Sequence, residues 1–203
     1  MNIIIENNNV SFGIKIPIDQ IYNLANVHFT TIPNTRNIEV SAITLIQSGF
    51  PDDLIQNFVR SVCRWGNYEG LAGRILRRNS LNEIRNAFIE AIERLSIIPI
   101  DFSGALASIN RLDGLGTPSF ASKHLRFLNP KNCPVYDSIL DESLPYSFDP
   151  QGYARFAQDC SLLADELMRL NVPNPFLERN GNWYVADVEA ALFIFIKDYN
   201  GIA

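Results

Sequence analysis

The segment between Gly114 and Ser138 is the most informative part of the chain. It reads Gly114-Leu115-Gly116-Thr117-Pro118-Ser119-Phe120-Ala121-Ser122-Lys123-His124-Leu125-Arg126-Phe127 and, after a short loop, Cys133-Pro134-Val135-Tyr136-Asp137-Ser138. Apolar side chains at helical spacing in residues 103–112 predict a short helix before it. The segment 113–117 cannot extend this helix, because its two glycines favour the positive φ angles of a tight turn. A second helix is predicted to begin at Pro118, which suits a first helical position, with Thr117 as its N-cap.

Backbone amides in this turn predict a site for an anion. The N–H groups of Gly114 and Gly116, and those at the start of the second helix, can bind a phosphate oxygen and so hold DNA by its backbone. A plain tight turn between two packed helices is the alternative interpretation. Asp137 also has two interpretations, which are compatible: an N-cap of the next helix, or a catalytic carboxylate.

The glycine turn, followed by Pro134-Val135-Tyr136-Asp137, resembles the helix-hairpin-helix superfamily of DNA glycosylases over residues 54–142. The resemblance is closest to the bacterial type of the 8-oxoguanine DNA glycosylase branch. It implies a mainly α fold, a helical bundle with a short extended or β segment at its N-terminus. We therefore expect residues 1–45 to form an arm or small hairpin that packs on a helical domain of residues 46–203, giving one globular unit.

The same resemblance implies an N-glycosylase that extrudes a modified or damaged base from DNA and excises it, leaving an abasic site. Asp137 would be the catalytic carboxylate. The expected partner is double-stranded DNA with a flipped base, and no obligate protein partner is implied. No cofactor or metal is expected, apart from a monovalent cation that the hairpin carbonyls could hold.

One position departs from the pattern of the oxoguanine branch. That branch carries a nucleophilic lysine at the start of the second hairpin helix, where this chain has Ser119, or Pro118 in an ungapped count. Neither residue is an amine, and a Schiff base with the sugar needs one. We therefore expect a monofunctional enzyme. Lys123 shares a helical face with Ser119 and is the alternative nucleophile, although a phosphate contact is its other interpretation.

Further site residues follow from the motif and from an aromatic cluster near the end of an earlier helix. The expected DNA contacts are Gly114, Gly116, Thr117, Ser119, Ser122, Lys123, His124 and Arg126. The expected base pocket comprises Trp65, Asn67, Tyr68, Phe120 and Tyr136, with core packing an equal alternative for Trp65. Glu189, on the last predicted helix, has two interpretations, a residue that faces the pocket and a residue on a solvated helix face, and the second is the expected one. Helices beginning near residues 54 and 81 are expected to face the hairpin across a cleft.

Charge is distributed unevenly along the chain. The formal net charge is −5, with a pI near 5.0, which is unusual for a DNA-binding protein. Residues 60–85 carry six arginines and two glutamates, and residues 111–131 carry four basic residues and one aspartate. The remainder of the chain is therefore strongly acidic. Segregation of positive charge into the segments around the motif is what local DNA binding needs.

Composition bounds the class of protein. No stretch approaches the roughly 18 apolar residues of a membrane span, and no signal pattern begins the chain, so we expect a cytoplasmic protein without membrane contact. Cys63, Cys133 and Cys160 lack metal-type spacing and are expected to be buried as small apolar residues. In the first forty residues, the runs Ile3–Ile5, Val10–Ile18 and Phe29–Ile32, with the turn Asn7–Asn9, indicate a short hairpin or an extended arm. A helix over Ile18–Ala25 is the alternative interpretation.

The substrate and the activity itself leave alternatives open. Within the glycosylase interpretation, the base is either a modified base of phage DNA, removed as antiviral defence, or an oxidised purine, removed as repair. The first competing function is a non-catalytic helix-hairpin-helix module that clamps DNA by its backbone. The second is an interaction domain that retains the fold without DNA binding, which the acidic pI favours.

Overall fold

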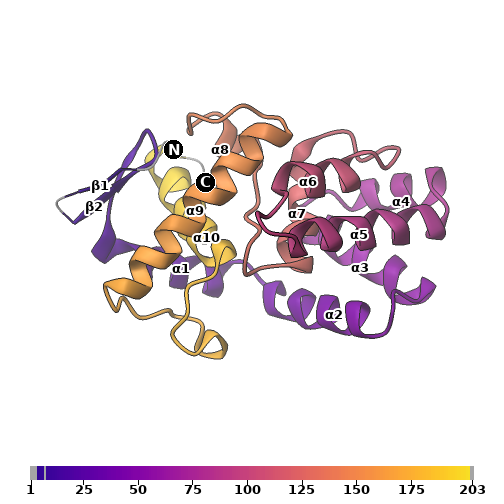
Figure 1. The fold of residues 1–203 in the computed structure, drawn as a ribbon, viewed down its shortest axis with the longest axis horizontal. Helices are drawn as coiled ribbons and strands as arrows, with labels where there is room; N and C mark the ends of the chain where they lie inside the picture. Colours follow the sequence, from indigo (N-terminus) through magenta and orange to yellow (C-terminus); the bar gives the residue numbers. More distant parts are fainter. Residues whose placement is uncertain (1–3, 7, 202–203) are drawn as a thin grey trace.

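The fold is mainly α-helical, with one small antiparallel sheet at the N-terminus (Figure 1). The computed structural model describes residues 4–6 and 8–201. The sheet consists of β1 (Ile4–Glu6), β2 (Asn9–Ser11) and β3 (Lys15–Pro17) in the order β1-β2-β3. Val10 pairs with Ile5 on one side and with Ile16 on the other, and both Val10 and Ile16 are fully buried. The sheet therefore turns one apolar face toward the helices.

The helices form two groups, which meet near the middle of the molecule (Figure 1). The terminal lobe contains the sheet with α1 (Ile18–Thr31), α8 (Ser138–Asp141), α9 (Pro150–Arg169), the short 3₁₀ helix η1 (Leu177–Arg179) and α10 (Val185–Tyr199). The central lobe contains α2 (Thr35–Gln47), α3 (Asp52–Trp65), α4 (Glu69–Arg78), α5 (Leu81–Ser96), α6 (Phe102–Asn110) and α7 (Pro118–Leu128). Contacts between α6 and α9 join the lobes.

The expected short β segment at the N-terminus is confirmed, but it covers less of the chain than residues 1–45. The strands end at Pro17, and residues 18–31 and 35–45 belong to α1 and α2, one in each lobe. The buried positions of α1 are Ile18, Ile21, Ala25 and His28, which follow the helical period that is the alternative interpretation of residues 18–25. Helix α1 packs along the apolar helix α10, so tertiary contact stabilises it. Ile3 and Asn7, which belong to the expected extended run and turn, lie outside the described residues.

The helix pair predicted around the glycine turn is confirmed. Helices α6 and α7 flank the turn, where Gly114 and Gly116 have φ angles of +88° and +79°. Pro118 is the first residue of α7, and Thr117 is its extended N-cap, but the Thr117 side chain makes no capping hydrogen bond. The first amides of α7 therefore have no side-chain acceptor from their own cap.

Helix α7 lies at the centre of the molecule. Every residue from Ala121 to Leu128 is buried, so this helix has no solvated face beyond its first turn. Its neighbours include α2, α3 and α6. A helix that is enclosed on all sides must bury its polar residues along with its apolar ones, and this has direct consequences for the expected DNA contacts.

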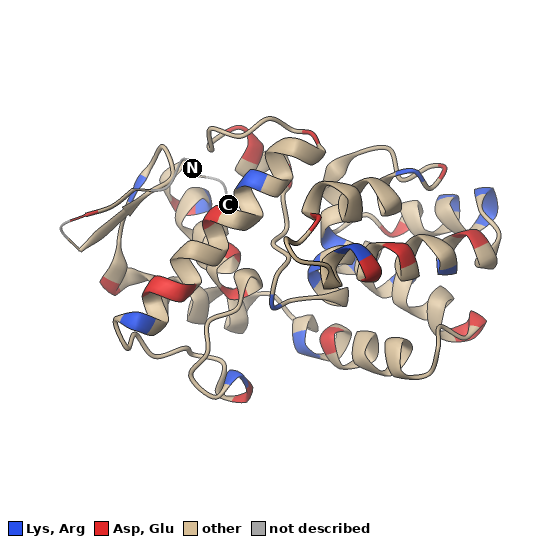
Figure 2. Cartoon of the chain, viewed as in Figure 1, with Lys and Arg blue, Asp and Glu red and all other residues tan. Residues whose placement is uncertain are grey.

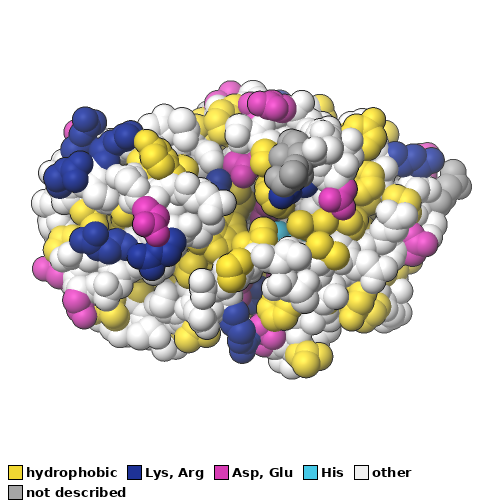
Figure 3. Space-filling model, turned by 180° about the vertical axis from the view of Figure 1, so that it is seen from behind, with side chains coloured by type: hydrophobic (Ala, Val, Ile, Leu, Met, Phe, Trp, Pro, Cys, Tyr) yellow, Lys and Arg dark blue, Asp and Glu magenta, His cyan; other side chains and the backbone are white. Residues whose placement is uncertain are grey.

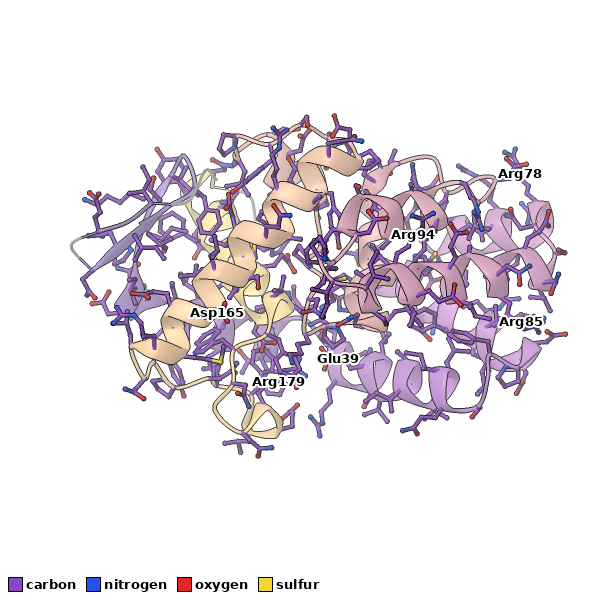
Figure 4. All side chains as sticks on the ribbon, viewed as in Figure 1. Glu39, Arg78, Arg85, Arg94, Asp165 and Arg179 are labelled. Atoms are coloured by element: carbon purple, nitrogen blue, oxygen red, sulfur yellow. The ribbon has the colours of Figure 1, made fainter. Side chains whose placement is uncertain are left out.

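A buried cluster of charges joins the two lobes. Glu39 on α2 accepts from Arg126 of α7 at 2.6 Å and from Arg179 of η1 at 2.9 Å, and Arg179 also pairs with Asp187 of α10 at 3.1 Å. Figure 4 labels Glu39 and Arg179 close together where the lobes meet. Burial alone would raise the pKa of Glu39, but the two guanidinium groups hold it below its ordinary value. Each charge in the cluster therefore depends on its partners.

The remaining features of the fold concern the cysteines and membrane contact. Cys63, Cys133 and Cys160 are free and fully buried, as the sequence predicts. In the part of the chain that the structure describes, no helix has both the length and the apolar character needed to span a bilayer.

Candidate active site between the lobes

A cavity of about 860 Å³ opens where the two lobes meet. Seen from behind, the surface is hollowed at this junction (Figure 3). The walls come from the end of α1, the start of α2, the end of α3, the middle of α7, the start of α8 and one face of α10. Two helices, beginning near residues 54 and 81, were expected to face the hairpin across a cleft. The first of them, α3, lines the cavity, whereas the second, α5, does not line it and packs on α6. The cavity is a property of both lobes together.

Asp137 lies in this cavity at the N-terminus of α8. Its Oδ1 accepts hydrogen bonds from the backbone N–H groups of Ile139 and Leu140 at 3.2 and 3.3 Å. Its Oδ2 lies 3.4 Å from Nζ of Lys123. One oxygen therefore fixes the carboxylate as a helix cap, and the other remains directed at the lysine in the cavity. The two interpretations of Asp137 are compatible in the structure, as expected.

Lys123 reaches back along α7, as its spacing from Ser119 predicts. Its ammonium donates to Oγ of Ser119 at 2.9 Å and lies 5.1 Å from the centroid of the Phe120 ring. The side chain is 8% exposed and lines the cavity. Ser119, Lys123 and Asp137 therefore form one hydrogen-bonded group, in which a largely buried amine faces a carboxylate.

Ser122 holds the backbone next to Asp137. Its hydroxyl accepts from the N–H of Tyr136 at 2.9 Å and donates to the carbonyl of Ser119 at 2.8 Å. The same loop supplies the carbonyls of Pro130 and Lys131, which accept from the first amides of α10. Because Ser122 is fully buried, it is no DNA contact, and the expectation for this residue is corrected. Its role is to position the loop that carries Asp137.

His124 and Arg126 are also buried, contrary to the expectation of a DNA-facing surface. The His124 ring packs against both Phe58 and Phe88, and its Nδ1 is 2.7 Å from the carbonyl of Phe120. Burial lowers the pKa of His124 to about 4, so the ring is neutral at pH 7. Arg126 is 1% exposed in its pair with Glu39. Both errors arise because α7 is enclosed, which its amphipathic sequence does not reveal.

Two of the five residues that were expected to form a base pocket, Trp65 and Asn67, line the cavity. The Trp65 ring also packs edge-on against Phe127, at 5.0 Å between centroids, and its Nε1 donates to Thr35 at 2.9 Å. Both interpretations of Trp65, cavity wall and core packing, therefore hold at once.

Tyr68, Phe120 and Tyr136 are outside the cavity lining. Tyr68 is 46% exposed and packs against Phe120, with its hydroxyl bonded to Arg74. Tyr136 is fully buried among aromatic rings of the terminal lobe, and its hydroxyl donates to the carbonyl of Tyr146 at 2.8 Å. Alternation along the extended segment explains the Tyr136 error, since Val135 and Asp137 face the cavity while Tyr136 faces away.

Glu189 is a cavity residue and does not lie on the solvated face that was expected. Its side chain is 3% exposed. Burial and the nearby Asp137 raise the pKa of Glu189 to about 8, against the opposing influence of Arg126, the Val135 N–H and Lys123. The sequence signal for this residue is a single acid within the apolar run from Val188 to Ile196. An isolated acid in such a run indicates a buried polar site.

His28 is a further cavity residue that the sequence analysis missed. It is 3% exposed, and its ring packs edge-on against Phe193 at 6.2 Å between centroids. Burial and the charge of Arg126 lower the pKa of His28 to about 3. Among the described residues its Nδ1 has no hydrogen-bond partner. The cavity therefore contains a neutral imidazole with an unused polar atom.

The exposed turn and the arginines beside it form a basic surface. Gly116 and Thr117 are exposed, and the Arg74 side chain lies against Gly114. Lys and Arg mark the free end of α4 in Figure 2 and gather on the central lobe in Figure 3. Arg64, Arg85 and Arg111 pair with acidic side chains. Within residues 4–6 and 8–201, Arg60, Arg74, Arg77 and Arg78 of this region form no ion pair with an acidic side chain, and Arg74 donates to the Tyr68 hydroxyl at 3.0 Å.

No protein-family model, curated protein or solved structure matches this chain. Among residues 4–6 and 8–201, the structure contains no group of three or more His, Cys, Asp and Glu side chains placed to hold a metal ion. The cation expected at the hairpin carbonyls remains a prediction.

Proposed function

We propose that this protein is a DNA N-glycosylase of the helix-hairpin-helix type, which extrudes a modified base into the cavity and hydrolyses its bond to the sugar. The observation that carries the proposal is the Lys123–Asp137 pair, whose charged atoms lie 3.4 Å apart in the cavity. Lys123 belongs to α7, the second helix of the pair that the glycine turn connects. A structural helix cap needs neither a cavity nor an amine beside it. The pair therefore supports a catalytic role in addition to the cap.

The chemistry follows from the two oxygens of Asp137. Cleavage of a glycosidic bond develops positive charge on the sugar ring. The Oδ1 atom is fixed by the amides of Ile139 and Leu140, so the carboxylate is oriented before the substrate arrives. The Oδ2 atom can then stabilise the cationic sugar and accept a proton from the attacking water. Since this attraction grows as charge develops, it stabilises the transition state more than the ground state.

The size of the cavity supports a bulky base. Pockets of roughly 300–1,000 Å³ hold drug-sized ligands, and this cavity of about 860 Å³ lies near the upper end of that range. An extruded purine alone is smaller than such a ligand. Hydrogen-bonding side chains of Asn34, Asn37, Ser41 and Ser61 line the part nearest α2 and α3. The volume and polarity favour a modified base of the kind phage DNA carries over an oxidised purine.

The basic surface supports DNA as the partner. The exposed glycine turn and the uncapped amides of α7 suit a phosphate oxygen, and Arg74, Arg77 and Arg78 lie on the helix beside the turn. These groups contact the sugar–phosphate backbone in the proposal and leave base reading to the cavity.

A second activity, strand cleavage as a lyase, is favoured by the same lysine. A neutral amine can add to C1′ of the sugar and displace the base, which leaves a Schiff base after ring opening. Asp137 is placed to accept the proton that the Lys123 ammonium must first lose. Borohydride reduction separates the two activities. A covalent protein–DNA product that Lys123→Gln abolishes establishes the lyase, and base release without such a product leaves a monofunctional hydrolase.

The test of the main proposal measures base release from phage and host genomic DNA and from duplexes that contain 8-oxoguanine. Alkali reveals abasic sites, and mass spectrometry identifies the released base. We expect Asp137→Asn to lower single-turnover release by a factor of at least about 100 while DNA retention is unchanged. Asp149→Asn is the matched control, because Asp149 caps α9 through the Gly152 amide without lining the cavity.

Two outcomes contradict the proposal. DNA retention without base release from any of these substrates identifies a non-catalytic DNA-binding module. Equal losses of stability and activity in Asp137→Asn and Asp149→Asn identify Asp137 as a structural cap.

A further inference from the structure

We infer that Glu189 reads the edge of the extruded base as a neutral carboxyl group, donating one hydrogen bond and accepting another. The inference rests on the proposed function. It selects a class of substrate: bases in which an acceptor ring nitrogen lies beside an amino group, as in cytosine and adenine derivatives.

Glu189 lies on the face of α10 that lines the cavity. Glu189, Phe193 and Lys197 follow one another at intervals of four residues, so they form a single stripe along α10, and all three line the cavity. Phe193 supplies an aromatic face one turn from the carboxyl group. His28 supports that ring from α1 with an edge-on contact. An aromatic face with a hydrogen-bonding group at its margin is the arrangement that holds a flipped base by stacking and by its edge.

The groups around Glu189 favour its neutral form. They come from four parts of the chain: Lys123 and Arg126 of α7, the Val135 N–H and Asp137 before α8, Tyr153 and Cys160 of α9, and His28 of α1 across the same cavity. Arg126 is already paired with Glu39 at 2.6 Å, and Lys123 with Asp137 at 3.4 Å. His28 is uncharged. Glu189 therefore lies beside a carboxylate and has no cation of its own.

The chemistry of the two forms separates the bases. An ionised carboxylate has acceptors only, so it complements the two adjacent donors of a guanine-type edge. A neutral carboxyl has one donor and one acceptor, which complement N3 and the amino group of cytosine or N1 and the amino group of adenine. A guanine-type edge would leave its second donor without a partner in a buried site, which is unfavourable. A buried carboxyl beside a carboxylate thus fits an edge that needs a donor.

The rate of base release should depend on pH through the protonation of Glu189. Burial and Asp137 place the pKa of Glu189 at about 8, so the neutral form predominates below that pH. Release of a cytosine- or adenine-type base should fall about tenfold for each unit of pH above it, as the donor is lost. Release of a guanine-type base should not fall in this way, because the carboxylate serves that edge.

The experiment compares wild type with Glu189→Gln and Glu189→Leu. Gln keeps one donor and one acceptor without titrating, whereas Leu keeps only the bulk. Single-turnover release is measured from pH 6 to 9 on phage DNA rich in modified cytosine and on duplexes with N6-methyladenine or 8-oxoguanine. We expect Glu189→Gln to retain base release within about tenfold and to lose the alkaline fall, and Glu189→Leu to lose release by a factor of at least about 100 on cytosine- and adenine-type substrates.

Several results would overturn the inference. One is an alkaline fall that persists in Glu189→Gln, since another group would then titrate. Another is faster release of 8-oxoguanine than of any cytosine- or adenine-type base. Carbon-13 NMR of the Glu189 carboxyl, assigned by the loss of its signal in Glu189→Gln, gives a test that needs no activity. A carboxyl group that is ionised at pH 6 contradicts the inference that Glu189 binds the base in its neutral form. Absence of base release in wild type, with a neutral carboxyl at pH 7, contradicts the proposed function instead. Thermal unfolding of each variant confirms that it is folded.

Discussion

Replacement of Arg126 by Met distinguishes a buried structural charge from a DNA contact. The sequence places Arg126 among the DNA contacts, but its guanidinium is 1% exposed, 2.6 Å from Glu39. It also lies 4.6 Å from the centroid of the Phe127 ring. Met retains most of the apolar packing and removes the charge. Glu39 then keeps only Arg179, at 2.9 Å, as a buried cationic partner, and Arg179 is shared with Asp187.

The expected loss of stability is about 3 kcal/mol. Breaking a buried ion pair by removing one partner costs about 3–5 kcal/mol, and the remaining Arg179 places this case at the lower end. For a chain of this size that corresponds to a decrease in Tm of roughly 6–12 °C. Urea unfolding followed by circular dichroism gives the free energy directly.

The matched control for this variant is Arg78→Met on the exposed end of α4. Arg78→Met should leave the free energy of unfolding unchanged and weaken DNA binding, with the slope of log K against log salt reduced by about one. Arg126→Met should do the reverse. If Arg126→Met is as stable as wild type and binds DNA with a reduced salt slope, then Arg126 is a DNA contact and not a buried structural charge.

Two further predictions concern the turn and the buried histidines. Gly114→Ala should destabilise the protein more than Gly116→Ala, because both positions have positive φ but only Gly114 lies against the Arg74 side chain; thermal unfolding ranks the two, and equal losses would contradict the packing argument. His28 and His124 have pKa values lowered to about 3 and about 4, so between those values and about 6.5 the unfolded chain binds more protons than the folded one. The free energy of unfolding should therefore decrease as pH falls from about 6.5 toward 4, and His124→Leu should reduce that dependence; a slope equal to that of wild type would show that His124 is not the titrating group.

Local sequence predicted the central part of the fold well. The glycine turn, the helix before it and the helix from Pro118 all follow from residue types whose conformational preferences act over a few positions. The pairing of Ser119 with Lys123 follows in the same way from the helical repeat. At the start of α5, Ser80 and Glu83 form a capping box, which is likewise an arrangement of residues three positions apart.

The same kind of reasoning could not assign the faces of α7 and α10. Sequence periodicity distinguishes an inside from an outside only when a helix has a solvated side, whereas α7 beyond its first turn and the first half of α10 are buried all round. Ser122, His124 and Arg126 therefore looked like surface residues, and Glu189 looked solvated. Their environments depend on α2, α9 and η1, which are far from them in sequence.

The turn-linked helix pair and the carboxylate that follows it can be predicted from local sequence, because both depend on backbone preferences and spacings within about twenty-five residues. The cavity that Lys123 and Asp137 share with Glu189 and His28 cannot be predicted in this way, since it forms where two lobes from distant parts of the chain meet. Burial then sets the charge of each group, and burial is a property of the packed molecule.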